Sequence, residues 1–230
     1  RNIRRDSLLL WIPLIPLVIA LAIRIGVPPL TGWLTDELGF DLSPYYPLIM
    51  SFYLVMTAAI VGVIVGFLLL DERDDRTLTA LLITPMPLST YILYRIGLPM
   101  LLGMGLTLIG YPIAGLVGLP VPLLLLVALM GTLSSPLMAL VLAVFADNKV
   151  AGFAVMKIMN GVMLLPTLAF FLPEPIQFLA GIVPPFWALK VFWAAAEGSP
   201  WLSTYVVIGF LLHIVTIMLL LRRFTTILHR

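Results

Sequence analysis

The sequence of 230 residues contains no cysteine, which excludes disulfide bonds and metal sites built from thiolates. Charge is also scarce, because charged residues make up 10% of the chain against about 25% in a soluble domain. Hydrophobic residues account for 62%, which is more apolar surface than a soluble core can bury. We therefore expect an all-α protein that crosses a membrane several times. The net charge of +2 is small and gives no indication of a nucleic-acid partner.

The sequence also lacks the motifs of common enzymes. It has no phosphate loop of the form G-x-x-x-x-G-K-[ST], no H-E-x-x-H and no G-x-S-x-G. Its two histidines, His213 and His229, are too few for a histidine-rich metal site. We therefore expect no catalytic, cofactor-binding or metal-binding residue on this chain. His213 is expected to have a hydrogen-bonded structural role.

Six apolar runs are each about as long as the 20 residues that a spanning helix requires. The first is too long for the core of a signal peptide and has no small-residue cleavage site, so we expect it to be retained. None of the runs carries a buried carboxylate, which disfavours transport coupled to protons or sodium. The predicted spans, which form a single transmembrane domain over residues 1–230, are 7–27, 47–70, 96–118, 121–146, 150–172 and 201–221.

Lysine and arginine are distributed unequally between the two sides of these spans. Arg24 and Lys190 are the basic residues of one side, and all the others belong to the opposite side. Because basic loops remain in the cytoplasm, we expect a multi-pass protein of the cell (inner) membrane with both termini and segment 71–95 in the cytoplasm. The predicted cytoplasmic residues are Arg1, Arg4, Arg5, Arg73, Arg76, Arg95, Lys149, Lys157, Arg222, Arg223 and Arg230.

Two segments are expected on the outer side. Residues 28–46 predict a loop of modest length. Residues 173–200 are too apolar for a solvated loop, and Pro184 and Pro185 divide them into two runs that are each too short to span. We expect two short re-entrant helices, buried in the outer leaflet and against a partner subunit. The alternative is an interfacial loop that lies flat on the membrane.

Polar residues inside a span are candidates for function. Asn160 follows Lys157 by about one helical turn, so both lie on the same face of the fifth span. This pair predicts a polar patch that faces a pathway. The alternative is a lysine that extends to the inner interface and an asparagine that joins two helices by a hydrogen bond.

A charged segment follows the second span. Every residue from Asp71 to Arg76 is charged, and Leu78, Leu81 and Leu82 follow at helical spacing before Pro85. This pattern predicts a short amphipathic helix below the bilayer, with acidic residues at its N-terminus, where the helix dipole favours them. Such a helix can dock into a groove on a soluble partner. The alternative is a solvated loop whose charges only set the topology.

The same segment resembles the permease subunits of ABC-2 type exporters. The resemblance rests on the pattern E-R-x-x-x-T-L-x-x-L-L-x-T-P between two spans, which runs from Glu72 to Pro85. Arg76 stands where that family often has glycine. The stretches 148–157 and 184–187 are similar to small permeases of the family that are assigned to drug export, including fluoroquinolone-type exporters. The resemblance covers essentially all six predicted spans.

The resemblance implies a translocation subunit of an ATP-driven exporter that moves small amphipathic molecules or drugs outward. Two permease subunits, identical or different, would pair in the lipid bilayer. A separate ATPase subunit would carry ATP and Mg. The alternatives are export of haem, lipid or glycan, and a non-transporting assembly or scaffold protein.

The resemblance also implies roles for particular residues in two regions. The implied ATPase-coupling residues are Asp71, Glu72, Arg73, Asp74, Asp75, Arg76, Thr77, Leu78, Leu81, Leu82, Thr84 and Pro85. The implied pathway candidates, on spans two and five, are Tyr53, Met56, Thr57, Asn160, Met163, Thr167 and Phe170.

Overall fold

The computed structural model describes residues 14–74 and 88–228, and every regular element in these two stretches is a helix. This confirms the predicted all-α class. The α-helices are α2 (Ile15–Leu38), α3 (Tyr46–Asp74), α5 (Leu88–Ala114), α6 (Val121–Thr132), α7 (Ser134–Phe145), α8 (Lys149–Leu168), α9 (Glu174–Gln177), α10 (Pro185–Glu197) and α11 (Leu202–Leu228). The short 3-10 helices are η2 (Ser43–Tyr45), η3 (Ala169–Phe171) and η4 (Phe178–Ile182).

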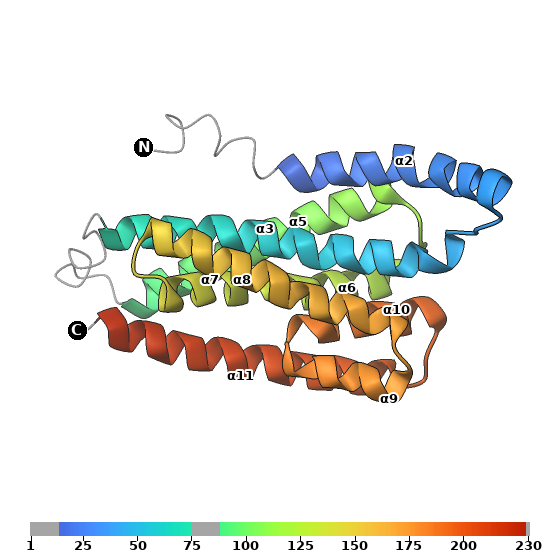
Figure 1. Cartoon of the computed structure of the whole chain (residues 1–230). Helices are drawn as coiled ribbons and strands as arrows, with labels where there is room; N and C mark the ends of the chain where they lie inside the picture. The colour runs from blue at the N-terminus through green and yellow to red at the C-terminus, as the bar shows by residue number, and fades with distance from the viewer. Residues whose placement is uncertain (1–13, 75–87, 229–230) are drawn as a thin grey trace.

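Within the described residues, six helical segments are long and apolar enough to cross a membrane, as predicted. They are α2, α3, α5, α6 together with α7, α8, and α11, and Figure 1 shows them alongside one another in a bundle. One end of this bundle carries Arg73, Lys149, Arg222 and Arg223 and is called the basic end below. The opposite end, which holds α9, is called the hairpin end.

The first span, α2, is longer than the sequence predicts. It continues through Pro28 and Pro29 to Leu38, so most of the segment expected as an outer loop is helical. Membrane helices tolerate proline, which removes single hydrogen bonds without ending the helix. The helix ends at Gly39, whose φ of +64° suits glycine, and the amides of this residue and the next bond to carbonyls of the last turn.

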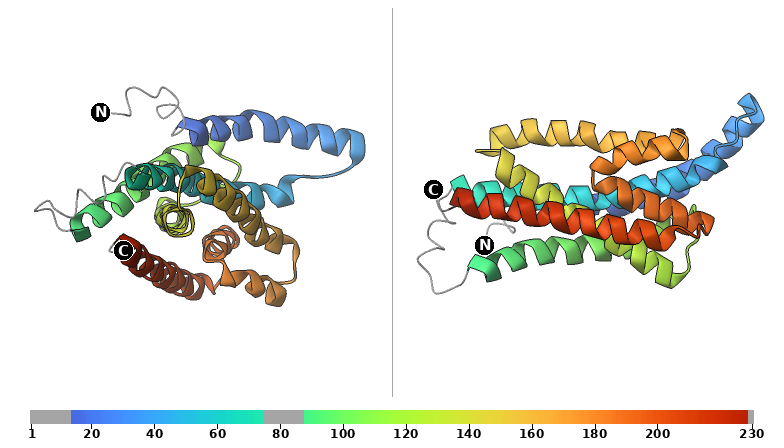
Figure 2. Two further views of the ribbon diagram at one scale, coloured as in Figure 1. Left: turned by 60° about the vertical axis from the view of Figure 1, so that its left-hand side comes forward. Right: turned by 90° about the horizontal axis from the view of Figure 1, so that it is seen from below.

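Helix α3 is the centre of the bundle and packs closely on α7. Seen from below in Figure 2, α8 lies on one side of α3 and α5 on the other. A Cβ atom at Gly62 would overlap the backbone of Ser135 and lie 2.8 Å from Met138 Cβ. One at Gly66 would lie 2.9 Å from Leu142 Cβ. Small residues at these positions therefore allow the two helices to approach.

The fourth span consists of two helices. Helix α6 ends at Thr132, and α7 begins at Ser134 after the single residue Leu133. Pro136 accounts for this break, because it has no amide hydrogen to donate to the carbonyl of Thr132, four residues earlier. The polar stretch 131–135 around the break is entirely buried, which agrees with a packing role.

The segment between the fifth and sixth spans forms a re-entrant hairpin, as predicted. Helix α9 and η4 make its first arm and α10 makes its second. Figure 1 shows the turn between the two arms about midway along α11, so the hairpin enters and leaves at the same end of the bundle. Pro184 and Pro185 lie at this turn.

The burial of the second arm differs from the prediction. Helix α10 packs against α3, α6 and α11 of its own chain, and Phe186, Trp187 and Trp193 are buried there. The indole N–H of Trp193 donates to Ser51 Oγ at 2.8 Å, and that of Trp187 donates to the Gly181 carbonyl at 3.0 Å. The expectation that the outer leaflet and a partner subunit bury this arm is therefore wrong, because the chain itself supplies the apolar surroundings and the hydrogen-bond acceptors.

Candidate functional site

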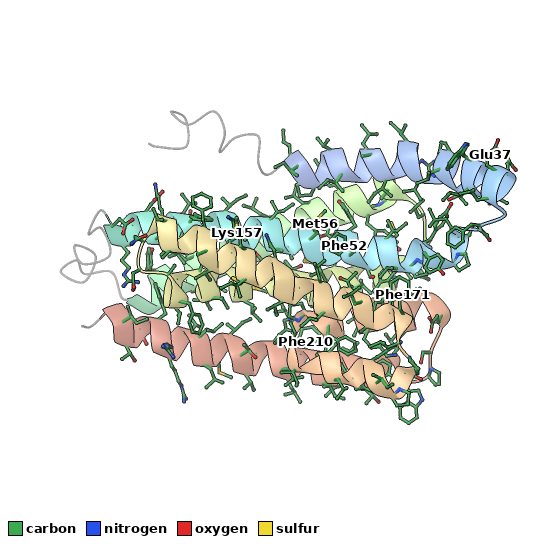
Figure 3. The ribbon with its side chains drawn as sticks, viewed as in Figure 1. Glu37, Phe52, Met56, Lys157, Phe171 and Phe210 are labelled. Atoms are coloured by element: carbon green, nitrogen blue, oxygen red, sulfur yellow. The ribbon has the colours of Figure 1, made fainter. Side chains whose placement is uncertain are left out.

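A long groove between α3 and α8, with a volume of about 910 Å³, is the first candidate site. Helix α3 contributes side chains at intervals of three and four residues, including Phe52, Met56, Val63 and Phe67, so one face of the helix forms a wall. Figure 3 shows Phe52 and Met56 of this wall beside α8. The groove is open along one side, where Asn160 of α8 is exposed.

Helix α8 forms the opposite wall, which is also mostly apolar. Its Phe153 ring lies 4.8 Å from the ring of Phe67, measured between centroids. Beyond these rings the groove is bounded by an ion pair, in which Lys149 Nζ lies 2.5 Å from Asp71 Oδ1. The lining of such a groove suits a largely apolar molecule with a small number of hydrogen-bonding groups.

Four of the seven pathway candidates line this groove. They are Met56 on α3 and Asn160, Met163 and Thr167 on α8. The amide of Asn160 and the hydroxyl of Thr167 supply polar atoms within the apolar lining, and the Thr167 hydroxyl also donates to the Met163 carbonyl at 3.4 Å. The structure thus brings candidates from two distant parts of the sequence to one surface. Lys157, although exposed on α8, does not line the groove.

The other three candidates lie elsewhere. Tyr53 and Thr57 are fully buried in the bundle, where the Thr57 hydroxyl donates to the Tyr53 carbonyl at 2.8 Å. The Tyr53 ring fills the space in front of Gly110 on α5. Phe170 lies nearer the hairpin end and packs edge-on against Trp193, with 5.2 Å between ring centroids. Each of them shapes the bundle around the groove without lining it.

The candidates predicted from the sequence leave out most of the α3 residues that line the groove. Ala59, Val63 and Phe67 line the groove but carry no polar or unusual feature that singles them out. Successive steps of three or four residues along the helix, starting at Met56, reach all three of these residues. The same rule on α8 leads from Asn160 back to Phe153, which the composition of the span does not mark.

The basic end contains a second candidate site, and here one expectation is wrong. Asp71 to Asp74 complete the last turn of α3 and do not begin a separate helix. Acidic residues are unfavourable at a helix C-terminus, and cationic partners offset this for Asp71 and Glu72. Glu72 pairs with Arg95 and accepts a hydrogen bond from the Tyr91 hydroxyl, both on α5.

Further contacts join α3 to the α7–α8 connection. Arg73 Nη1 donates to the Ala146 carbonyl at 3.3 Å, and its Nη2 lies 3.4 Å from Asp147 Oδ1. Lys149, at the start of α8, pairs with Asp71. The basic ends of α3, α5 and α8 are therefore tied together by ion pairs. The remaining coupling candidates lie outside the described residues: Asp75, Arg76, Thr77, Leu78, Leu81, Leu82, Thr84 and Pro85.

A third site, at the hairpin end, surrounds the ammonium group of Lys190. This side chain is 9% exposed, and its Nζ donates to Glu174 Oε1 and to Gln177 Oε1, each at 2.9 Å. The ammonium group also lies 5.4 Å from the ring centre of Phe178 and 5.2 Å from that of Tyr205. A polar pocket of about 260 Å³ adjoins it. These contacts hold both arms of the hairpin to α11.

His213 is hydrogen-bonded inside the bundle, which is consistent with the structural role expected from the sequence. It is fully buried in α11, and its Nδ1 donates to the Gly209 carbonyl at 2.8 Å. Its Nε2 lies 3.5 Å from the hydroxyl of Ser134 on α7. The imidazole therefore links two spans at the break in the fourth.

Comparison with known proteins gives a consistent result. The family model described as "Fluoroquinolones export permease protein Rv2686c-like" matches residues 1–221. Two relatives from Mycobacterium tuberculosis are each 33% identical over 228 residues, which cover 97% of this chain and 90% of theirs. They are "Fluoroquinolones export permease protein MT2760" of strain CDC 1551 and "Fluoroquinolones export permease protein Rv2686c" of strain H37Rv. No solved structure gives a significant match.

Proposed function

Because the chain belongs to the Rv2686c-like family of fluoroquinolone export permease proteins, we propose that it exports fluoroquinolone-type drugs as the membrane subunit of an ABC-2 type exporter. The chain is a transporter component rather than an enzyme. The names of the two mycobacterial relatives support the cargo, and the groove between α3 and α8 supports it independently. Fluoroquinolones are flat and amphipathic, and the groove offers apolar walls with a few polar groups.

The groove between α3 and α8 forms one half of the transport pathway. It is open along one side, so a second permease subunit, identical or different, closes it across the lipid bilayer. Met56, Asn160, Met163 and Thr167 contact the cargo in this arrangement. Phe170 lies beyond the groove on the way to the hairpin end. The other two predicted pathway residues on α3, Tyr53 and Thr57, reach the cargo only if α3 rotates about its own axis during transport.

A separate ATPase subunit, which binds ATP and Mg, supplies the energy. Its contact on this chain is the coupling segment from Asp71 to Pro85. The ion pairs of Glu72, Arg73 and Asp71 support this proposal, because they connect the end of α3 to α5 and α8. A displacement of the segment by the ATPase is thereby passed to both walls of the groove.

The whole chain acts as a single permease domain in the cell (inner) membrane, with the basic end and both termini in the cytoplasm. The concentration of lysine and arginine at that end supports this orientation. The re-entrant hairpin then lies on the outer side, where it borders the exit from the groove.

Filling the groove tests the proposal. Membrane vesicles from cells that co-express the chain with its ATPase subunit should accumulate a fluoroquinolone when ATP is supplied. Met56→Trp places a large ring in the groove and should reduce this uptake several-fold. Leu101→Trp adds the same ring at an exposed position on α5, away from the groove, and should leave uptake unchanged. Equal uptake by the two variants would refute the assignment of the pathway.

A further inference from the structure

A second apolar groove, of about 460 Å³, lies on the other side of α8. Helices α7, α8 and α11 form its walls, and the turn of the re-entrant hairpin closes one end. Leu137 and Val141 of α7 and Val162 of α8 face it, and Thr216 of α11 supplies the one hydroxyl among its described lining residues. This groove has almost no hydrogen-bonding capacity.

The length of the second groove matches one leaflet of a bilayer. From Leu137 to Phe145 the lining of α7 covers nine residues, whose ends are separated by about 12 Å along the helix. One leaflet contributes about 15 Å of hydrocarbon, half of the usual core. Figure 1 shows the hairpin turn about midway along α11, and Pro184 and Pro185 of this turn line the groove together with Thr216 of α11. The groove therefore runs from mid-membrane to the basic end.

A cation lies at the open end of this groove. The guanidinium carbon of Arg223 is 5.2 Å from the ring centre of Phe145, which lines the groove and is 54% exposed. Arg223 follows Thr216 by seven residues, so both occupy the same face of α11. Arg222 beside it is exposed as well. Among the described residues, no carboxylate lies within ion-pair distance of either arginine.

We infer that the second groove binds an anionic phospholipid of the cytoplasmic leaflet. One acyl chain lies between α7, α8 and α11, with its terminal methyl group below Pro184 and Pro185. The phosphate group lies at the membrane surface and pairs with Arg223. Basic pockets between spanning helices on the cytoplasmic side have the charge that such head groups require. The depth of the site assumes the orientation proposed above but not the identity of the cargo.

The chemistry of the groove favours a lipid over a drug or a free anion. A drug with ionisable groups would leave those groups without partners along the apolar walls, which is costly. A free phosphate ion would use Arg223 but leave the groove unfilled. A phospholipid matches both parts, since its chain is wholly apolar and its charge is at one end. Because α8 also borders the transport groove, an occupied lipid site supports the wall that contacts cargo.

Binding to the purified full chain in detergent tests this inference without any transport assay. Native mass spectrometry should show phosphatidylglycerol binding at least tenfold more tightly than phosphatidylcholine with the same acyl chains. Arg223→Gln should abolish this preference and leave phosphatidylcholine binding unchanged. Lys157→Gln, which removes an exposed cation of α8 that lines neither groove, should preserve the preference.

A second set of variants tests the acyl chain. Val141→Trp and Val162→Trp each fill the groove from a different helix and should weaken binding of both lipids at least tenfold. Met218→Trp, at an exposed position on the opposite face of α11 from Thr216 and outside the groove, should have no effect. Glycerol phosphate, which lacks acyl chains, should not compete. Full competition by glycerol phosphate, or phosphatidylglycerol binding that is unaffected by the groove variants and by Arg223→Gln, would overturn the site.

Discussion

Removing the carboxylate of Glu174 should destabilise the protein more than removing the ammonium group of Lys190. The two side chains form one ion pair but differ in burial, since that of Lys190 is 9% exposed and that of Glu174 is 59% exposed. Glu174→Ala leaves a nearly buried cation without its anionic partner, which is costly. Lys190→Met leaves a carboxylate that can turn to solvent.

The expected magnitudes follow from the contacts. A hydrogen bond to a charged group contributes about 1.5–3 kcal/mol, and solvent screening of the exposed carboxylate places this pair towards the lower end. We expect Glu174→Ala to lower the free energy of unfolding by about 2 kcal/mol. Lys190→Met keeps an unbranched apolar side chain between the rings of Phe178 and Tyr205. Exchanging a buried charge for an apolar group of similar volume costs little, so we expect about 1 kcal/mol or less.

Thermal unfolding in detergent measures this difference. A change of 1 kcal/mol shifts Tm by about 2–4 °C in a chain of this size, so Glu174→Ala should lower Tm by several degrees. Glu197→Ala is the matched control, because Glu197 lines the same pocket but belongs to none of the described ion pairs. If Lys190→Met lowers Tm as much as Glu174→Ala, packing of the lysine stem is decisive and the charge-based reasoning is refuted.

The same pair predicts a dependence on pH. Hydrogen bonds from Lys190 and Tyr205, together with the charge of Lys190, hold the pKa of the Glu174 carboxyl below its ordinary value of 4.5. A carboxyl with a lowered pKa in the folded state contributes stability that is complete above the unfolded pKa and is lost as the pH falls through the folded one. The Tm difference between the wild type and Glu174→Ala should therefore be constant near pH 7 and shrink in acid.

Three further predictions concern packing, the basic end and orientation. Gly62→Ala should lower the free energy of unfolding by about 2–3 kcal/mol, because the added methyl group overlaps α7. Gly105→Ala is the control, since no atom lies within 4 Å of the new Cβ, and it should leave Tm in detergent nearly unchanged. Glu72→Gln leaves an arginine of α5 without its charged partner and should reduce both Tm and ATP-driven uptake in vesicles. A cysteine at Asp36 should react in intact cells with an impermeant thiol reagent, and one at Arg222 should not; the opposite labelling would reverse the proposed orientation.

The fold was largely predictable because membrane spans depend on length and apolarity alone. The hairpin was predictable for a related reason, since Pro184 and Pro185 divide an apolar segment too short to cross twice. Its packing partners were not, because the contacts of Trp193 with Ser51 join residues far apart in the sequence. The length of α2 was missed for a local reason: Pro28 resembles a helix end, but membrane helices tolerate it.

The candidate site was harder to predict from sequence. Helix α3 is apolar on every side, so no amphipathic pattern distinguishes its groove-facing side from its buried side. The family resemblance therefore implied Met56 and Tyr53 together as pathway candidates, although Met56 lines the groove and Tyr53 is buried in the bundle. The end of α3 posed a similar difficulty. The helix continues past Asp71 because its last acidic residues have cationic partners on other helices. Lys149 of α8 pairs with Asp71, and Arg95 of α5 pairs with Glu72.

The packing of α10 also has a consequence for how the protein is made. This arm is enclosed by α3 and α6, which leave the ribosome before it, and by α11, which leaves the ribosome after it. Until α11 is inserted, Trp187 lacks the neighbour formed by Gly209, and Lys190 lacks the ring of Tyr205. The hairpin therefore cannot reach its final position during synthesis of the first five spans. Closure of the hairpin is therefore a late step of membrane insertion, which follows the arrival of α11.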